Sequence, residues 1–305
     1  MKPDDRPRAT RMAHLRTSLH RLAGLATGIV LLLDGSATAA QQAAPDTASN
    51  PAGGPCATAP TVDEHELAPI IERITVPAKG FSMAGIAPAL MAKFGALQAA
   101  QAKHQARDWP NLCRYREQNV AVLRGGVRPD VVFLGDSITE FWRYAQPDLF
   151  GDRLVDRGIS GQTTPQILLR FYADVVALHP RAVHIMAGTN DIAGNTGPTS
   201  DDAIFDNIRA MIDIAGVNHI KVVLASITPA TDGPARPATR IRALNVRLRE
   251  LARQRGAIFV DYYPLLSDGQ NGIKPTLAND GLHPNRDGYA AMRPLTERAL
   301  AEALR

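Results

Sequence analysis

Two short polar clusters in the second half of the chain contain residue types that can carry out nucleophilic catalysis. One ends in Ser137, and the other places His283 three positions after Asp280. A serine hydroxyl is a weak nucleophile unless a neighbouring base takes its proton. A histidine can take it near neutral pH, and a carboxylate bonded to the other ring nitrogen fixes its tautomer and orientation. The pattern predicts Ser137 as nucleophile, His283 as base and Asp280 as the residue that orients His283.

Two further clusters supply candidate hydrogen-bond donors, residues 158–164 around Gly161 and residues 188–191 around Asn190. Acyl transfer places negative charge on a substrate oxygen, and preorganised donors stabilise that charge. Gly161 has no side chain, so its backbone N–H can approach a substrate closely. Asn190 offers a side-chain amide, and the Ser137 N–H is expected at the start of a helix. We expect Ser137, Gly161 and Asn190 to form an oxyanion hole.

The elements that must position these clusters begin near residue 129. Short apolar, β-rich runs alternate with longer stretches of helical spacing, which predicts βαβ units and a parallel sheet covered by helices on both faces. The polar clusters then lie at the carboxyl ends of the strands, where such sheets bind ligands. The expected strands are residues 131–134, 154–156, 182–186, 221–226 and 258–261, and the expected helices are residues 165–178, 201–215, 240–255 and 287–304.

Taken in order, the four clusters resemble the four sequence blocks of the SGNH/GDSL hydrolases, and the resemblance covers residues 128–305. It implies a flavodoxin-like three-layer α/β/α sandwich with a five-stranded parallel sheet in the order 2-1-3-4-5. It also implies ester hydrolysis through an acyl-enzyme, without metal or cofactor, and assigns the roles given above to the same residues. The Gly-x-Ser-x-Gly motif of the α/β-hydrolases is absent, which argues against that fold.

The N-terminal region predicts export. Residues 1–39 combine an Arg-rich stretch, an apolar run from Leu22 to Leu33 and a small-x-small sequence at residues 37–39, as in a secretory signal peptide. An uncleaved membrane anchor is the alternative. Without these residues the chain has 28 basic and 27 acidic side chains, so the net charge of +4 does not indicate nucleic-acid binding. We expect a periplasmic or secreted protein with no membrane span after cleavage.

Residues 40–62 are rich in Ala, Pro, Thr and Gly and are predicted to be a flexible linker. Residues 63–127 are predicted to be a helical segment, with helices over residues 83–104 and 115–123, and the sequence indicates no role for it. Cys56 and Cys113 form an even pair, which in an oxidising compartment suggests one disulfide, with two unrelated thiols as the alternative. No His, Cys, Asp or Glu spacing suggests zinc.

Three polar residues outside the predicted triad are interpreted as structural. His184 lies inside an expected strand and is predicted to be a core histidine, while Asp136 and Asp191 are expected to hold loops through backbone hydrogen bonds.

The expected substrate is a small-molecule or glycan ester with a short acyl group, in particular acetyl. No long apolar insertion follows any of the four clusters, and residues 192–198 form only a short, Gly-rich loop. The same site could serve a lysophospholipid or a thioester. A catalytically degenerate glycan-binding surface protein is the alternative from another class. The sequence indicates neither the natural substrate nor the oligomeric state.

Overall fold

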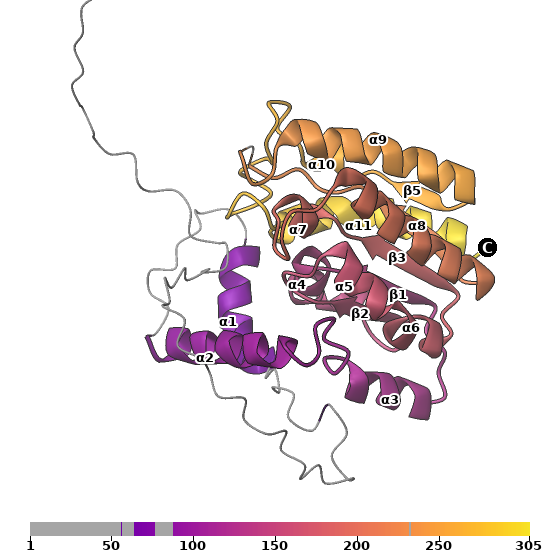
Figure 1. The fold of residues 1–305 in the computed structure, drawn as a ribbon, viewed down its shortest axis with the longest axis horizontal. Coiled ribbons are helices and arrows are strands. Elements are labelled where there is room, and N and C mark those ends of the chain that lie inside the picture. The colour runs from indigo at the N-terminus through magenta and orange to yellow at the C-terminus, as the bar shows by residue number, and fades with distance from the viewer. Residues whose placement is uncertain (1–55, 57–63, 77–87, 232) are drawn as a thin grey trace, which may run out of the picture. The chain divides into compact units, whose positions relative to one another are not determined.

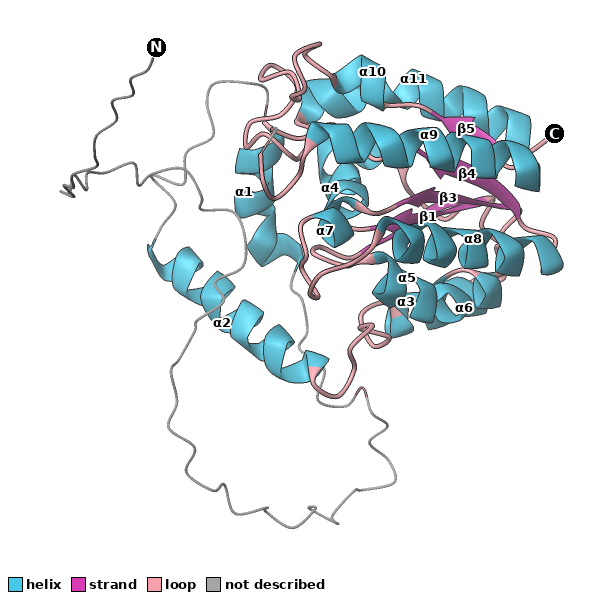
Figure 2. Cartoon of the chain, turned by 45° about the horizontal axis from the view of Figure 1, so that its top comes forward, coloured by secondary structure: helices cyan, strands magenta, loops and turns pink. Residues whose placement is uncertain are grey.

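A computed structural model describes residues 56, 64–76, 88–231 and 233–305. The expected signal peptide lies outside these residues, as does the expected linker apart from Cys56. The described chain forms a five-stranded, all-parallel sheet in the order β2-β1-β3-β4-β5, with helices on both faces (Figures 1 and 2). The predicted fold class and strand order are confirmed. The strands are β1 (Val131–Gly135), β2 (Leu154–Gly158), β3 (Ala182–Met186), β4 (Lys221–Ala225) and β5 (Ile258–Val260).

The sheet separates two hydrophobic cores because successive side chains of a strand point to opposite faces. Val132 and Leu134 of β1 belong to one core, and Val131 and Phe133 belong to the other. All five residues of β1 are buried, as expected for a central strand covered on both sides. The first core is covered by α5 (Thr164–Leu169), α6 (Phe171–Asp174), η2 (Val176–Leu178), α8 (Asp201–Val217) and α9 (Ala238–Arg255), and the second by α4 (Ser137–Ala145), α10 (Tyr263–Leu266) and α11 (Arg286–Ala303).

Side-chain caps fix where several of these helices begin. Asp136 accepts the Ile138 N–H at 2.9 Å before α4, Ser200 accepts the Ala203 N–H before α8, and Asn285 accepts the Gly288 N–H before α11. Each cap satisfies a backbone donor that has no partner inside its helix. Two short elements, η1 (Pro147–Leu149) and α7 (Thr189–Ile192), complete the sheet domain.

The single helix expected over residues 165–178 is instead broken into α5, α6 and η2. The first break falls at Arg170, whose φ of −95° and ψ of 1° leave the helical region. Its guanidinium is fully buried and bonded to other segments. Apolar spacing does not reveal such inward polar contacts, and for this reason the predicted helix is too long.

Within the described residues, three helices precede the sheet: α1 (Glu64–Thr75), α2 (Pro88–Gln105) and α3 (Arg116–Arg124). The last two overlap the helices predicted over residues 83–104 and 115–123, of which residues 83–87 lie outside the described residues. Ile71 of α1 joins the second core, beside α4. Cys56 and Cys113 form the predicted disulfide, with their Cα atoms 5.2 Å apart. Within the described residues, no helix combines the length and the apolar character needed to cross a membrane.

Candidate active site

The structure brings Ser137, His283 and Asp280 into one hydrogen-bonded line. Ser137 Oγ lies 2.8 Å from His283 Nε2, and His283 Nδ1 lies 2.6 Å from Asp280 Oδ2. The other Asp280 oxygen, Oδ1, accepts the backbone N–H groups of Leu282 and His283 at 3.0 and 2.8 Å. These contacts leave the His283 ring in an orientation that can take a proton from the serine hydroxyl.

The carboxylate of Asp280 is held in its charged form. Burial alone would raise the pKa of Asp280, but hydrogen bonds from His283 and its neighbours outweigh burial and place that pKa below its usual value. The side chains of His283 and Asp280 are 14% and 5% exposed, so solvent screens their interaction only weakly. A charged Asp280 favours the imidazolium that forms when His283 accepts a proton.

Ser137 is positioned by the junction between β1 and α4. It is the first residue of α4, where backbone N–H groups have no partner inside the helix. Gly135 permits the close approach of α4 to the sheet, since a Cβ there would lie 2.1 Å from Thr139 Oγ1 and 2.4 Å from the Met186 carbonyl oxygen. The intervening residue, Asp136, is buried, and burial raises the pKa of its carboxyl group to about 6.

Gly161 lies in the loop of residues 159–163, which we call the oxyanion loop, and Asn190 of α7 contacts this loop. Gly161 has a φ of +78°, a conformation that favours glycine. Among the described residues, no acceptor is bonded to its N–H. Asn190 Nδ2 donates to the Gln162 carbonyl oxygen at 3.0 Å, which uses one amide hydrogen and leaves the second for another acceptor. The sequence analysis did not foresee this contact.

Residues outside the four clusters also hold the oxyanion loop. Glu140 of α4 accepts hydrogen bonds from the backbone and the hydroxyl of Ser160, the first of them at 2.7 Å. Asn195 Nδ2 donates to the Gly161 carbonyl oxygen at 3.1 Å, and Tyr115 Oη donates to the Gly158 carbonyl oxygen. The sequence analysis assigned none of these residues a role. Only Glu140 had a local signal, since it lies three positions after Ser137 on the same helix.

Arg236 is a further residue at this edge of the sheet that the sequence did not mark. Its Nε donates to Thr189 Oγ1 at 3.1 Å, next to Asn190. Burial lowers the pKa of Arg236, while the charges of Asp136 and Asp280 oppose that effect. Arg236 therefore supplies a positive charge facing the two carboxylates of the site.

The three residues interpreted as structural have the expected contacts. His184 is fully buried with Nε2 3.0 Å from Tyr262 Oη, and burial lowers the pKa of its ring to about 3. Its Nδ1 has no partner among the described residues. Asp191 accepts the Thr164 N–H at 2.9 Å and the Thr164 hydroxyl at 2.6 Å, and Asp136 caps α4. These side chains stabilise the strand, loop and helix that surround Ser137, His283 and Asp280.

One group of potential metal ligands lies outside the site and consists of His104, Asp108 and Cys113. The Cys113 sulfur is bonded to Cys56, so it is not a thiolate. Asp108 already accepts the backbone N–H groups of Leu112 and Cys113, each at 2.9 Å, and lies 3.3 Å from His104 Nε2. These contacts account for the cluster as a turn that the disulfide stabilises.

Comparisons with known proteins agree with this geometry. Residues 133–291 match the family model of the GDSL-like lipase/acylhydrolase family. The chain is 41% identical to a candidate acylhydrolase from Bacteroides fragilis, with a TM-score of 0.60, covering 65% of this chain and 99% of that one. It is 39% identical to a GDSL-like lipase from Bacteroides thetaiotaomicron, with a TM-score of 0.60, covering 64% and 98%. A comparison with curated proteins gives no match. The chain therefore belongs to the GDSL-like lipase/acylhydrolase family and is a carboxylic ester hydrolase.

Proposed function

We propose that the chain is an exported esterase that removes short acyl groups, in particular acetyl, from small-molecule or glycan esters. The observation that carries this proposal is the hydrogen-bonded line from Ser137 Oγ through His283 to Asp280. In the first step Ser137 Oγ attacks the ester carbonyl carbon while His283 Nε2 takes its proton and passes it to the departing alcohol. In the second step water, deprotonated by His283, attacks the acyl-serine and releases the acid.

The proposed oxyanion hole consists of the N–H groups of Ser137 and Gly161 and the free amide hydrogen of Asn190. The start of α4 supplies the first donor, and the positive φ of Gly161 supports the second. The bond from Asn190 to the Gln162 carbonyl oxygen supports the third, because it holds the amide beside the oxyanion loop. Such donors stabilise the tetrahedral intermediate more than the bound ester.

The preference for short acyl groups is supported by the loop of residues 192–198. The loop folds tightly on itself, since the Gly197 N–H donates to the Gly194 carbonyl oxygen at 2.9 Å. It also contacts the oxyanion loop through Asn195 and through Thr196, whose hydroxyl lies 3.1 Å from that of Thr163. We infer that such a short, polar loop leaves the acyl site shallow. A shallow site does not gain the roughly 0.8 kcal/mol available for each buried CH₂ as the acyl chain lengthens.

Labelling with a serine-reactive fluorophosphonate tests the nucleophile. We expect labelling and hydrolysis of p-nitrophenyl acetate in the wild type, and neither in Ser137→Ala. Ser267→Ala is the matched control, because the Ser267 hydroxyl accepts the Gly269 N–H and belongs to none of the four clusters. Hydrolysis by Ser137→Ala at the wild-type rate would overturn the proposal, as would the absence of labelling in the active wild type.

A series of p-nitrophenyl esters from C2 to C16 tests the acyl preference. We expect kcat/KM to be highest from acetyl to butyryl and to fall for octanoyl and longer chains. A maximum at C10 or beyond would replace the short-chain proposal with a lipase- or lysophospholipase-like activity. Faster turnover of acetyl thioesters than of acetyl esters would indicate a thioesterase.

Export is tested separately by expressing the full chain in a bacterial host. We expect periplasmic or secreted protein that lacks residues 1–39 and contains the Cys56–Cys113 disulfide, as determined by mass spectrometry of intact and reduced protein. Recovery of uncleaved protein in the membrane fraction would support the membrane-anchor alternative.

A further inference from the structure

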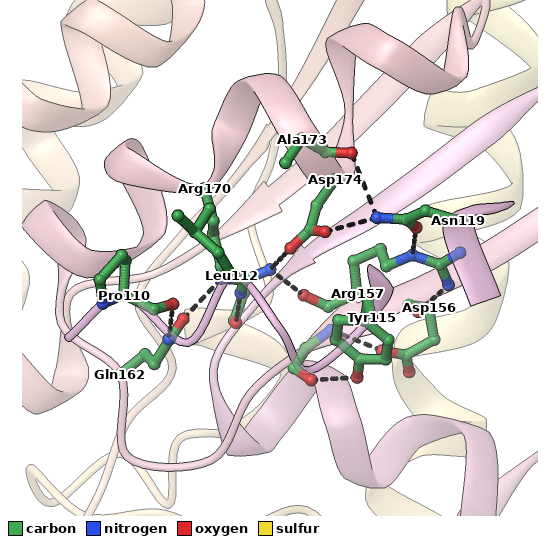
Figure 3. A network of polar contacts seen from close by, with 12 residues as sticks. Pro110, Leu112, Tyr115, Asn119, Asp156, Arg157, Gln162, Arg170, Ala173 and Asp174 are labelled. Carbon is green, nitrogen blue, oxygen red and sulfur yellow. Dashed lines mark hydrogen bonds and ion pairs between the residues drawn. The ribbon is translucent and has the colours of Figure 1, made fainter. Parts of the chain in front are cut away.

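Arg170 is a fully buried cation at the break between α5 and α6, and the proposed mechanism leaves it without a role. Its guanidinium joins separate segments of the chain (Figure 3). Nε donates to Gln162 Oε1 at 2.6 Å, Nη1 donates to the Arg157 carbonyl oxygen at 2.7 Å and to Asp174 Oδ2 at 2.9 Å, and Nη2 donates to the Gly135 carbonyl oxygen at 2.8 Å.

Two of these contacts reach the segments that carry the proposed oxyanion donors. Gly135 ends β1 two positions before Ser137, and Gln162 directly follows Gly161. The backbone carbonyl of Gln162 in turn accepts the Asn190 amide. Arg170 thus makes one hydrogen bond to the end of β1 and one to the oxyanion loop. Through Gln162 it is also linked to Asn190 of α7, which follows β3.

We propose that Arg170 is a positioning residue for the oxyanion hole, which fixes the distance between the Ser137 segment and the oxyanion loop. This inference rests on the proposed function, because it presupposes that these segments meet the substrate oxygen. The guanidinium suits the task because its donors leave a rigid planar fork in fixed directions. A lysine ammonium supplies charge but cannot reproduce that fork.

The position of the oxyanion donors matters more for stabilising the transition state than for binding the ester in its ground state. An oxyanion donor acts only when it lies within hydrogen-bond distance of the charge that develops, and shifts of about 1 Å cost large factors in rate. A loosened oxyanion loop would still bind the ester in its ground state. Loss of the Arg170 contacts should therefore lower kcat far more than it raises KM.

The same buried network contains a part that does not contact the oxyanion loop, and this part supplies a matched control. Asn119 Nδ2 donates to Asp174 Oδ1 at 2.8 Å and to the Ala173 carbonyl oxygen at 3.1 Å, and Asn119 Oδ1 accepts from Arg157 Nε at 2.7 Å (Figure 3). Its removal takes three hydrogen bonds from the network without breaking a bond to Gly135 or Gln162.

The experiment compares Arg170→Lys and Arg170→Met with Asn119→Ala, using p-nitrophenyl acetate kinetics and thermal unfolding. We expect both Arg170 variants to lower kcat by about 10- to 100-fold with KM within about threefold, and Arg170→Lys to be the less affected. Asn119→Ala should lower the Tm while its kcat stays within about twofold at temperatures where it is folded. Equal losses of kcat in all three variants, or an unchanged kcat in Arg170→Lys, would overturn the positioning role.

A fourth variant keeps the test decisive if neither Arg170 variant folds. Gln162→Met is close in size to the native side chain and removes the link from Arg170 to the oxyanion loop, leaving the other contacts of Arg170 in place. We expect it to reproduce the fall in kcat with little change in KM, and wild-type kcat would overturn the proposal. If the wild type shows no hydrolysis that depends on Ser137, the proposed function fails first and this inference fails with it.

Discussion

The two loops that meet at the candidate active site are held in opposite ways. In the loop of residues 280–283, His283 is oriented by Asp280, which contacts both its ring and its backbone. The oxyanion loop has one backbone hydrogen bond of its own, from the Gln162 N–H to the Ile159 carbonyl oxygen at 3.3 Å, and depends mainly on contacts from outside the loop. Glu140 and Asn195 contact its backbone from 20 and 34 positions away, and Arg170 contacts the Gln162 side chain from eight positions away.

This difference separates the residues proposed to transfer protons from the contacts that position the proposed oxyanion donors. A carboxylate three positions before a histidine orients the ring through contacts within the same loop. Proton transfer then requires only that the serine hydroxyl lie within hydrogen-bond distance of the histidine. The Gly161 N–H can act only if long-range contacts set its position. Variants of the first loop should therefore abolish proton transfer, while variants around the second should reduce transition-state stabilisation by degrees.

The largest effect is expected for Asp280→Asn. The asparagine amide can donate to His283 Nδ1, which would favour the tautomer that cannot accept the serine proton. We expect kcat to fall by about 10⁴-fold, as for the equivalent change in a serine protease triad. Steady-state kinetics at neutral pH measure it, and a loss below tenfold would show that His283 does not depend on local orientation.

Asn190→Ala should have the next largest effect, because it removes a donor without disturbing proton transfer. We expect kcat to fall by about 10²–10³-fold, with a smaller change in KM. A mutant with unchanged kcat and a tenfold higher KM would identify Asn190 as a substrate-binding residue only. That result would remove Asn190 from the proposed oxyanion hole.

Asp156→Asn tests whether the buried carboxylate of Asp156, which accepts the Gly158 N–H within β2 at 2.7 Å, has a cost in stability. Burial raises the pKa of Asp156 to about 6, although Arg143 and the Gly158 N–H oppose that effect. Its Oδ2 has no hydrogen-bond partner among the described residues. Because the folded-state pKa lies above the unfolded value, ionisation disfavours the folded state, and stability decreases as pH rises from about 4 to about 6.

Asparagine cannot ionise, so the variant should lose this part of the pH dependence. We expect the free energy of unfolding to fall by about 2–3 kcal/mol less between pH 4 and pH 7 than in the wild type. Denaturant unfolding across this range measures the difference, with Asp136 contributing in both proteins. Parallel curves for the two proteins would show that Asp156 titrates in its ordinary range.

The smallest effect is expected for Glu140→Gln, which keeps the shape of the side chain that holds Ser160 but removes its charge. A charge-assisted hydrogen bond is worth more than a neutral one by about 1 kcal/mol, so we expect kcat to fall by up to about tenfold. His283 should be unaffected, and the pH dependence of kcat/KM should match that of the wild type. A loss as large as that of Asn190→Ala would mean that Glu140 has a more direct part in the reaction.

Features that depend on local sequence patterns could be predicted from the sequence, whereas contacts between separate segments could not. The regular alternation of buried strands and amphipathic helices predicts the parallel sheet, and the resemblance to the SGNH/GDSL hydrolases supplies the strand order. Ser137, His283 and Asp280 are candidates because each lies in a short, recognisable cluster. Asn190 was found through its cluster, yet its bond to the Gln162 carbonyl oxygen was not.

The contacts that hold the strand ends beside the oxyanion loop could not be predicted because their partners are far apart in sequence. Tyr115 reaches Gly158 at the end of β2 across 43 positions, and Arg170 reaches Gly135 at the end of β1 across 35. The one local sign of Arg170 was an arginine between Leu169 and Phe171 in an otherwise apolar stretch. That sign equally fits a side chain whose charged end reaches solvent.

The close packing around Gly135 has a consequence for protein engineering. Even an alanine Cβ at this position would overlap Thr139 Oγ1 and the Met186 carbonyl oxygen, so the helix that carries the nucleophile has no room to shift relative to the sheet. A mutant library aimed at new substrates should leave this junction unchanged. It should also keep Asn195 and Thr196, which contact the oxyanion loop, and diversify the other positions of residues 192–198, which do not direct the attacking oxygen.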